Sequence, residues 1–233
     1  MVQSEIALIV GAGPGLSASL ARLFRKEAMS VALAARDVKK LDALVKEIGG
    51  RAYVCDASVP MDVENLFEAV SKDLGTPNIV VYNASGRVRG PLPDLDPDEV
   101  RKTIMITCYG GFLVGQAAAK RMIKAGLGTI LFTGASASVK GYANSAAFAM
   151  GKMGLTGLVQ SMARELQPQN IHVAQVVIDG GIYDAARPDR LTARGADGGL
   201  DPDAIAQTYL HLHRQHRSAW ASQVELRPWA EKF

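Results

Sequence analysis

The sequence contains few of the residues that form disulfides or bind metals. Its 233 residues include only two cysteines, Cys55 and Cys108, and four histidines. This is too few cysteines for a disulfide scaffold, and the histidines, three of them at positions 211, 213 and 216, form no ligand motif such as HExxH. We therefore expect no metal site, and we interpret the histidines as buried or solvated side chains.

Long apolar runs and blocks of like charge are also missing. No stretch approaches the roughly 18 uninterrupted apolar residues that a membrane-spanning helix requires. Glycines interrupt the apolar run near the first residue, so we expect no secretion signal and a cytoplasmic protein. The 26 basic and 23 acidic side chains are dispersed, which argues against nucleic acid or a membrane as a partner.

What the sequence does contain is a regular alternation of short apolar runs with segments of helical periodicity. Because parallel strands need crossover connections, this alternation predicts an α/β fold, a doubly wound parallel sheet of the Rossmann type with helices on both faces. We expect one dinucleotide-binding domain over residues 1–233, with an irregular substrate loop around 179–202. Strands are expected at 6–10, 31–35, 52–55, 79–82, 129–132 and 173–178. Helices are expected at 16–27, 38–48, 63–74, 99–124 and 143–166.

Glycines occupy the turn between the first expected strand and the first expected helix. Gly11, Gly13 and Gly15 lie where the amides of a helix N-terminus can face an anion without interference from side chains. The pyrophosphate of a dinucleotide is the natural ligand, and we expect these glycines and Leu16 to contact it. A purely structural turn is the alternative, since a glycine-rich turn is a weak signal by itself.

Three segments together resemble the short-chain dehydrogenase/reductase family. The glycine turn has the spacing of that family's TGxxxGxG motif, with Val10 and Ser17 in place of its Thr and last Gly. The pair Asp56 and Ala57 resembles the family's adenine-contacting pair, and residues 82–86, YNASG, resemble its NNAG motif. The resemblance spans nearly the whole chain. It implies cofactor contacts at Asp56, Ala57, Asn83 and Ala84.

The end of the second expected strand indicates which dinucleotide is bound. Ala35 stands where an NAD-preferring member of the family carries an acid for the ribose hydroxyls. Arg36 follows it, and a guanidinium suits a 2′-phosphate through charge-assisted, bidentate contacts. We therefore favour NADP(H) over NAD(H). The alternatives are that Arg36 is a surface charge and that Asp37 caps the next helix or approaches the ribose.

The resemblance also implies a catalytic set, and this chain departs from it. The family's YxxxK motif runs here from Phe148 to Lys152, so the lysine that holds the nicotinamide ribose is present and the proton-donating phenol is not. Thr107 stands where the family has a catalytic Asn, and Ala135 stands where it has a substrate-orienting Ser. The neighbouring Ser136 is the expected replacement for that serine.

Other groups near the expected nicotinamide pocket are candidates for the missing functions. Ser138 is a less favoured replacement for the serine, and Tyr142 and Tyr183 are candidate proton donors, with ordinary packing as the alternative. The family's PG motif after the sixth strand is Asp179-Gly180 here, which keeps the glycine that lets the backbone approach the nicotinamide. A positioned general acid contributes about 10²–10⁴-fold to a rate, so its loss slows hydride transfer without forbidding it.

Two functions therefore remain open. The first is an NADP(H)-dependent short-chain oxidoreductase that transfers hydride to or from a small carbonyl or alcohol substrate with altered catalytic residues. The second is an NADP(H)-binding sensor or structural subunit without redox turnover. Members of the family commonly associate through the helix that carries YxxxK. That helix has small residues here, so we expect a homodimer or homotetramer. The small residues are Ala146, Ala147, Gly151, Gly154 and Gly157.

Overall fold

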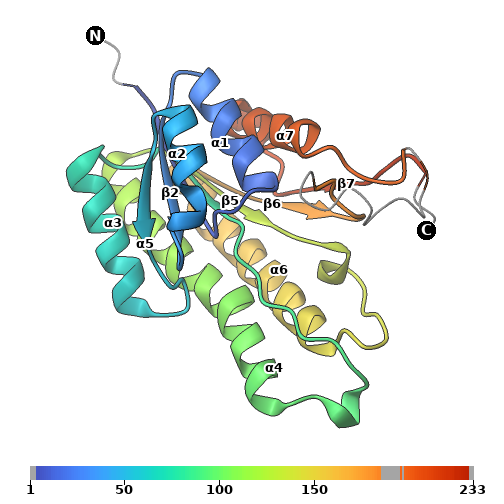
Figure 1. The fold of residues 1–233 in the computed structure, drawn as a ribbon. Helices are drawn as coiled ribbons and strands as arrows, with labels where there is room; N and C mark the ends of the chain where they lie inside the picture. Colours follow the sequence, from blue (N-terminus) through green and yellow to red (C-terminus); the bar gives the residue numbers. More distant parts are fainter. Residues whose placement is uncertain (1–3, 185–194, 196, 231–233) are drawn as a thin grey trace.

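A computed structural model describes residues 4–184, 195 and 197–230. Within these residues, seven parallel strands form one sheet in the order β3-β2-β1-β4-β5-β6-β7, and Figure 1 shows helices on both of its faces. The predicted doubly wound α/β sheet is confirmed. The strands are β1 (Ile6–Val10), β2 (Ser30–Ala35), β3 (Arg51–Val54), β4 (Ile79–Tyr82), β5 (Gly128–Thr133), β6 (Ile171–Ile178) and β7 (Gln223–Leu226).

The helices divide into two layers, each with its own apolar core. The helices are α1 (Leu16–Lys26), α2 (Asp42–Ile48), α3 (Pro60–Asp73), α4 (Pro97–Ile104), α5 (Gly110–Ala125), α6 (Ala146–Leu166) and α7 (Pro202–Arg214). Buried residues of α1, α2 and α7 form one core with the sheet, and those of α3, α5 and α6 form the other. The inner strands are almost wholly buried because both faces are covered, and only the edge strands β3 and β7 have exposed residues.

The long helix expected at 99–124 is interrupted. A π-helical turn, η3 (Met105–Tyr109), separates α4 from α5. The buried hydroxyl of Tyr82 donates to the carbonyl of Ile106 inside this turn, and a Cβ at Gly110 would lie 2.5 Å from the same hydroxyl. The side chain at the end of β4 therefore packs directly against this turn and the start of α5. Extra-residue turns of this kind often occur at functional sites.

The sequence did not predict the last helix and the last strand, α7 and β7. Asp201 caps α7 by accepting a hydrogen bond from the backbone N–H of Asp203, and Pro202 occupies the first turn. The strand β7 pairs with β6 and extends the sheet at that edge. In the region expected to be irregular, Ile182 forms a bridge with Leu200, and residues 185–194 and 196 lie outside the described residues.

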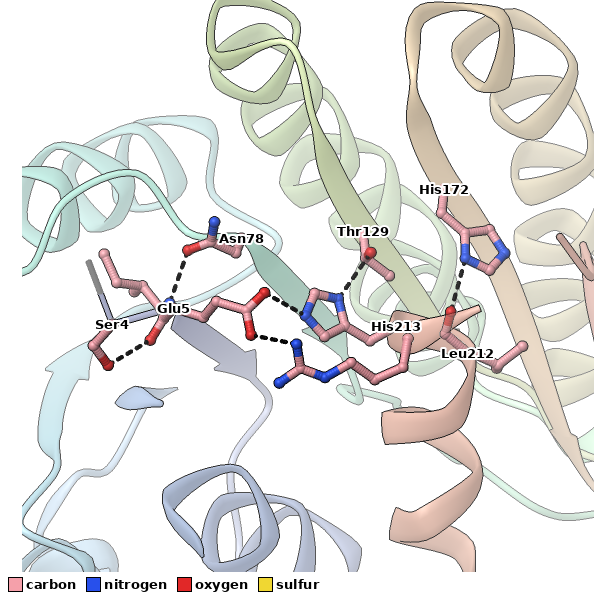
Figure 2. Close-up of polar contacts among 9 residues, drawn as sticks. Ser4, Glu5, Asn78, Thr129, His172, Leu212 and His213 are labelled. Carbon is pink, nitrogen blue, oxygen red and sulfur yellow. Dashed lines mark hydrogen bonds and ion pairs between the residues drawn. The ribbon is translucent and has the colours of Figure 1, made fainter. Parts of the chain in front are cut away.

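Buried histidines hold α7 and the tail against the sheet. His213 lies between Thr129 and Glu5 (Figure 2). Its Nδ1 is 3.0 Å from Thr129 Oγ1 and its Nε2 is 3.1 Å from Glu5 Oε1, and Glu5 also pairs with Arg214. Both ring nitrogens of His172 face backbone carbonyls, those of Leu212 at 3.0 Å and Ala221 at 2.8 Å. Its ring also stacks on Trp220, with centroids 4.8 Å apart. These histidines are structural.

Candidate functional site

A cavity of about 330 Å³ opens at the carboxyl ends of β1, β2 and β4. The order of the sheet reverses between β1 and β4, and such a switch point is where open α/β sheets bind ligands. The structure brings together in its wall seven of the residues expected to bind a cofactor: Gly11, Gly13, Arg36, Asp56, Ala57, Asn83 and Ala84. Gly15, Leu16, Lys152 and Gly180 do not line this cavity.

One glycine of the turn lies against the backbone of another segment, and the other two have open space beside them. Gly11 has φ +84°, and a Cβ there would lie 2.4 Å from the backbone nitrogen of Ala84. At Gly13 and Gly15, an added Cβ would meet nothing within 4 Å. α1 begins at the next residue without a side-chain cap or an acidic residue in its first turn. The N–H groups of Gly11 and Ala12 donate to the carbonyl of Ala34, and no side chain competes with an anion for the N–H groups at the start of α1.

Ser17 and Asn83 join this turn to the end of β4. The side-chain amide of Asn83 donates to Ser17 Oγ at 2.8 Å, and Ser17 Oγ donates to the carbonyl of Gly11 at 3.3 Å. Ser17 thus replaces the last glycine of the family motif with a side chain that fixes the turn. Asn83 is a turn residue that also lines the cavity.

The cavity has basic side chains near the carboxyl end of β2. Arg36 and Lys40 both line it, and the carboxylate of Asp37 accepts the backbone N–H of Lys39 at 3.0 Å. Asp37 thus binds the first backbone N–H of the short 3₁₀ turn η1 (Lys39–Leu41) that precedes α2, although the N-cap residue of this turn is Val38. Lys40 was missed from the sequence because it lies in a turn after Arg36, where no local pattern marks it as a cavity residue.

Asp56 also lines this cavity. Its carboxylate accepts hydrogen bonds from the backbone N–H and the hydroxyl of Ser58, at 2.9 and 2.6 Å. Burial alone would raise the pKa of Asp56, but these hydrogen bonds and the charge of Arg36 together lower it. Asp56 therefore acts as a carboxylate, which accepts hydrogen bonds.

The expected catalytic end lies at the start of α6. Phe148 and Lys152 are both buried there, and Lys152 Nζ donates to the carbonyl of Thr133 at 2.7 Å. Burial, with a smaller contribution from the charge of Arg87, lowers the pKa of Lys152 to about 7. The Arg87 guanidinium carbon lies 4.0 Å from the centroid of the Phe148 ring, and Lys152 Nζ lies 5.8 Å from it. The Phe148 ring is thus in contact with the guanidinium of Arg87 and close to the amine of Lys152.

The hydroxyl groups near this end differ in whether they already form hydrogen bonds within the protein. Thr107 is fully buried, and its Oγ1 accepts the backbone N–H of Gly86 at 2.9 Å. Ser138 Oγ accepts the backbone N–H of Ala135 at 3.1 Å. Ser136 Oγ has no hydrogen-bond partner among the described residues.

The tyrosine candidates lie on loops. Tyr142 is 47% exposed beside Lys140, and the backbone N–H of Tyr183 donates to the carbonyl of Leu200.

Asp179 and Gly180 follow β6 and are covered by the C-terminal segment. Arg227 Nη2 contacts the buried carboxylate of Asp179 at 2.8 Å, and Lys140 Nζ lies 3.6 Å from it. A Cβ at Gly180 would lie 2.7 Å from Pro228 Cδ, so this glycine is required by packing. Arg227 was missed from the sequence because nothing local marks a residue 48 positions away as a partner of Asp179.

Comparison with known proteins assigns the chain to a family. Residues 5–187 match the family described as short chain dehydrogenase. The chain belongs to this family. It is 30% identical over 182 residues to a 3-oxoacyl-[acyl-carrier-protein] reductase of Bos taurus, covering 77% of this chain and 76% of that one.

Solved structures of short-chain dehydrogenases have the same fold over almost the whole chain. One from Rhodopseudomonas palustris is 33% identical, with a TM-score of 0.84, and the match covers 97% of this chain and 99% of that one. A metagenomic short-chain oxidoreductase solved in complex with NADP is 30% identical, with a TM-score of 0.83, over 97% and 98% of the respective chains.

Other functional classes find no support among the described residues. No helix in this part of the chain is long and apolar enough to cross a membrane. No group of three or more His, Cys, Asp or Glu side chains within the same residues is arranged to hold a metal ion. In this short-chain dehydrogenase, the chemistry-bearing groups gather instead at the carboxyl edge of the sheet.

Proposed function

We propose that this short-chain dehydrogenase is an NADP(H)-dependent oxidoreductase that acts on a small carbonyl or alcohol substrate by hydride transfer. The observation that carries the proposal is the cavity at the switch point of the sheet, with a glycine turn at one end and basic side chains at the other. When bound, the cofactor supplies or accepts the hydride. We further propose that the whole chain forms one domain; its cytoplasmic location stays a prediction.

Two cations support the preference for a 2′-phosphate. Arg36 and Lys40 line the same cavity, and Asp37, the nearest acid after β2, accepts a hydrogen bond from the backbone N–H of Lys39. A guanidinium and an ammonium at one site bind a phosphate through charge-assisted hydrogen bonds. A relative that is 30% identical to this chain, the metagenomic short-chain oxidoreductase, was solved in complex with NADP. Arg36→Ala with Lys40→Ala should weaken NADPH binding by about 10- to 100-fold and leave NADH binding within about threefold.

Lys152 is the titratable group best placed to hold and release a proton at this site. It is buried, one helical turn after Phe148, and its pKa of about 7 lets Nζ exist in both protonation states near neutral pH. We propose that Lys152 holds the nicotinamide ribose, as in the family motif, and that Ser136 donates a hydrogen bond to the substrate oxygen. Tyr142 and Tyr183 remain candidates for a displaced proton donor.

A second candidate function is cofactor binding without redox turnover. It is favoured by the Thr107 hydroxyl, which is engaged with Gly86, and by Phe148, whose ring offers no proton. Fluorescence titration with NADPH and turnover on a panel of aldehydes, ketones and alcohols separate the two functions. Turnover by the parent supports the oxidoreductase. Activity that arises only in Phe148→Tyr would support the non-catalytic function, and absence of NADPH binding would contradict both.

We also propose that the chain forms a homodimer or homotetramer through α5 and α6. Phe112, Met150 and Met153 are 40%, 55% and 42% exposed on these helices. Gly157 has open space beside it, whereas a Cβ at Gly154 would lie 2.9 Å from Cys108 Sγ of the same chain. Light scattering on Met150→Glu with Met153→Glu should report a monomer, and an unchanged mass would contradict this interface.

A further inference from the structure

A buried amide lies behind the turn that carries Ser136. Gln175 belongs to β6 and is only 1% exposed. An amide in such a place destabilises a fold unless its polar atoms find partners. Its Oε1 lies 3.1 Å from Thr156 Oγ1, and its Nε2 lies 3.5 Å from Ser138 Oγ. Gln175 therefore joins β6 to α6 and to the 3₁₀ turn η4 (Ser136–Ser138).

Ser138 closes this turn from within. Its Oγ accepts the backbone N–H of Ala135 at 3.1 Å, and its own backbone N–H donates to the carbonyl of Ala135 at 2.7 Å. A Cβ at Gly134 would lie 3.1 Å from both Gln175 Nε2 and Ser138 Oγ, so the end of β5 packs closely against the same two groups. The backbone around the turn is thus held by side chains, and the hydroxyl of Ser136 takes no part in these bonds.

Thr156 extends the contacts to the segment that carries Lys152. Its Oγ1 lies 3.0 Å from the carbonyl of Lys152, one helical turn earlier, and 3.4 Å from the carbonyl of Ser138. One hydroxyl therefore contacts the backbone of both segments that the proposed function brings to the substrate. A displacement of about 1 Å between groups that hold a reacting molecule can cost about 100-fold in rate, so the spacing of these segments matters.

We propose that Gln175 and Thr156 are positioning residues, which keep the Ser136 hydroxyl at a fixed distance from Lys152. The inference rests on the proposed oxidoreductase function and adds two residues to its site. Ala135 stands where the family has its serine, so the replacing hydroxyl is one residue further along and depends on the orientation of the turn. Neither Gln175 nor Thr156 lines the cofactor cavity, so their replacement should leave cofactor binding unchanged.

Amide hydrogen exchange of the whole protein, measured by mass spectrometry, tests whether the amide holds the turn. Gln175→Met keeps a side chain of similar length without its polar atoms. Residues 134–139 should then exchange about tenfold faster, while residues 6–10 of β1 should exchange as in wild type. Gln160→Met, which removes an exposed amide one turn after Thr156 on α6, should change neither segment. Unchanged exchange at 134–139 in Gln175→Met, or equally faster exchange in both segments, would overturn the inference.

Turnover tests the consequence for the reaction. The assay uses the member of the aldehyde, ketone and alcohol panel that wild-type protein converts fastest. Thr156→Val, which removes the hydroxyl, should lower kcat/KM by about 10- to 100-fold, whereas Thr156→Ser, which keeps it, should stay within about threefold of wild type. NADPH affinity should stay within about threefold in both variants and in Gln175→Met, which also shows that they are folded.

The outcomes separate this inference from the proposed function. Equal kcat/KM in Thr156→Val and Thr156→Ser contradicts the positioning role alone, because wild-type turnover still supports an oxidoreductase. Wild-type protein that binds NADPH but converts no member of the panel contradicts the proposed function, and the role of these two residues in catalysis fails with it.

Discussion

Replacing Lys152 by methionine should stabilise the protein. A lysine amine that is 3% exposed loses most of its hydration, and its pKa falls from 10.5 to about 7. At about 1.4 kcal/mol for each pKa unit, this difference costs about 4 kcal/mol of folding free energy at pH 7. Lys152→Met removes that cost but leaves the Thr133 carbonyl without its 2.7 Å partner, a loss of about 1–3 kcal/mol. The expected net gain is about 1–3 kcal/mol.

The dependence on pH is the sharper part of this prediction. Between pH 7 and 10.5 the unfolded chain binds more protons at Lys152 than the folded protein does, because the folded pKa is the lower one. Wild-type stability therefore rises with pH across this window, and the Lys152→Met variant lacks this contribution. The advantage of the variant should shrink by about 2 kcal/mol between pH 7 and pH 9.

Urea unfolding of the cofactor-free protein, followed by circular dichroism at pH 7 and pH 9, measures both effects. Lys46→Met, on the exposed side of α2, is the matched control and should show no such pH-dependent difference. A Lys152→Met variant whose stability relative to wild type is equal at both pH values would refute the reasoning, since the amine would then be hydrated in the folded protein. Loss of NADPH binding in the same variant would show why a destabilising lysine is retained.

Two further substitutions test structural roles. His172→Leu should lower the free energy of unfolding by about 2–4 kcal/mol in urea unfolding. Burial lowers the pKa of His172, so the neutral ring donates its one N–H to the carbonyl of either Leu212 or Ala221, and the variant loses this hydrogen bond and the ring stacked on Trp220. The exposed His211→Leu should cause no such loss. Gly11→Ala should lower both the melting temperature and NADPH affinity, because its Cβ would meet Ala84, whereas Gly13→Ala, which has open space, should leave the melting temperature unchanged. Equal effects of the two alanines would contradict this account of the turn.

The strands and the glycine turn were predictable because their signals are local. β1 and β4 were predicted with their observed bounds, and the other four expected strands overlap the observed ones, since continuous apolar runs mark buried parallel strands. β7 was missed because its alternating burial makes it a weak pattern at the edge of the sheet. α7 has a recognisable Asp201-Pro202 start that was read as the end of a loop.

The π-helical turn could not be predicted in the same way. Its residues continue the helical periodicity of α4 and α5, and the hydroxyl that binds the turn, that of Tyr82, comes from a different part of the chain. Helix propensity contains no information about which side chain will face the helix from a strand. The same limit applies to the Thr107 hydroxyl, whose engagement with Gly86 appears only once the two segments are packed together.

The sequence by itself determined the order of strands and helices, the glycine turn, and the presence of Phe148 one turn before Lys152, because each is a pattern of neighbouring residues. The tertiary structure alone decided that Arg36 and Lys40 share a cavity with the turn, and that Arg87 covers Phe148. Parallel strands bring distant loops to one edge of the sheet, and the contacts made there depend on how those loops pack, which spacing along the chain does not encode.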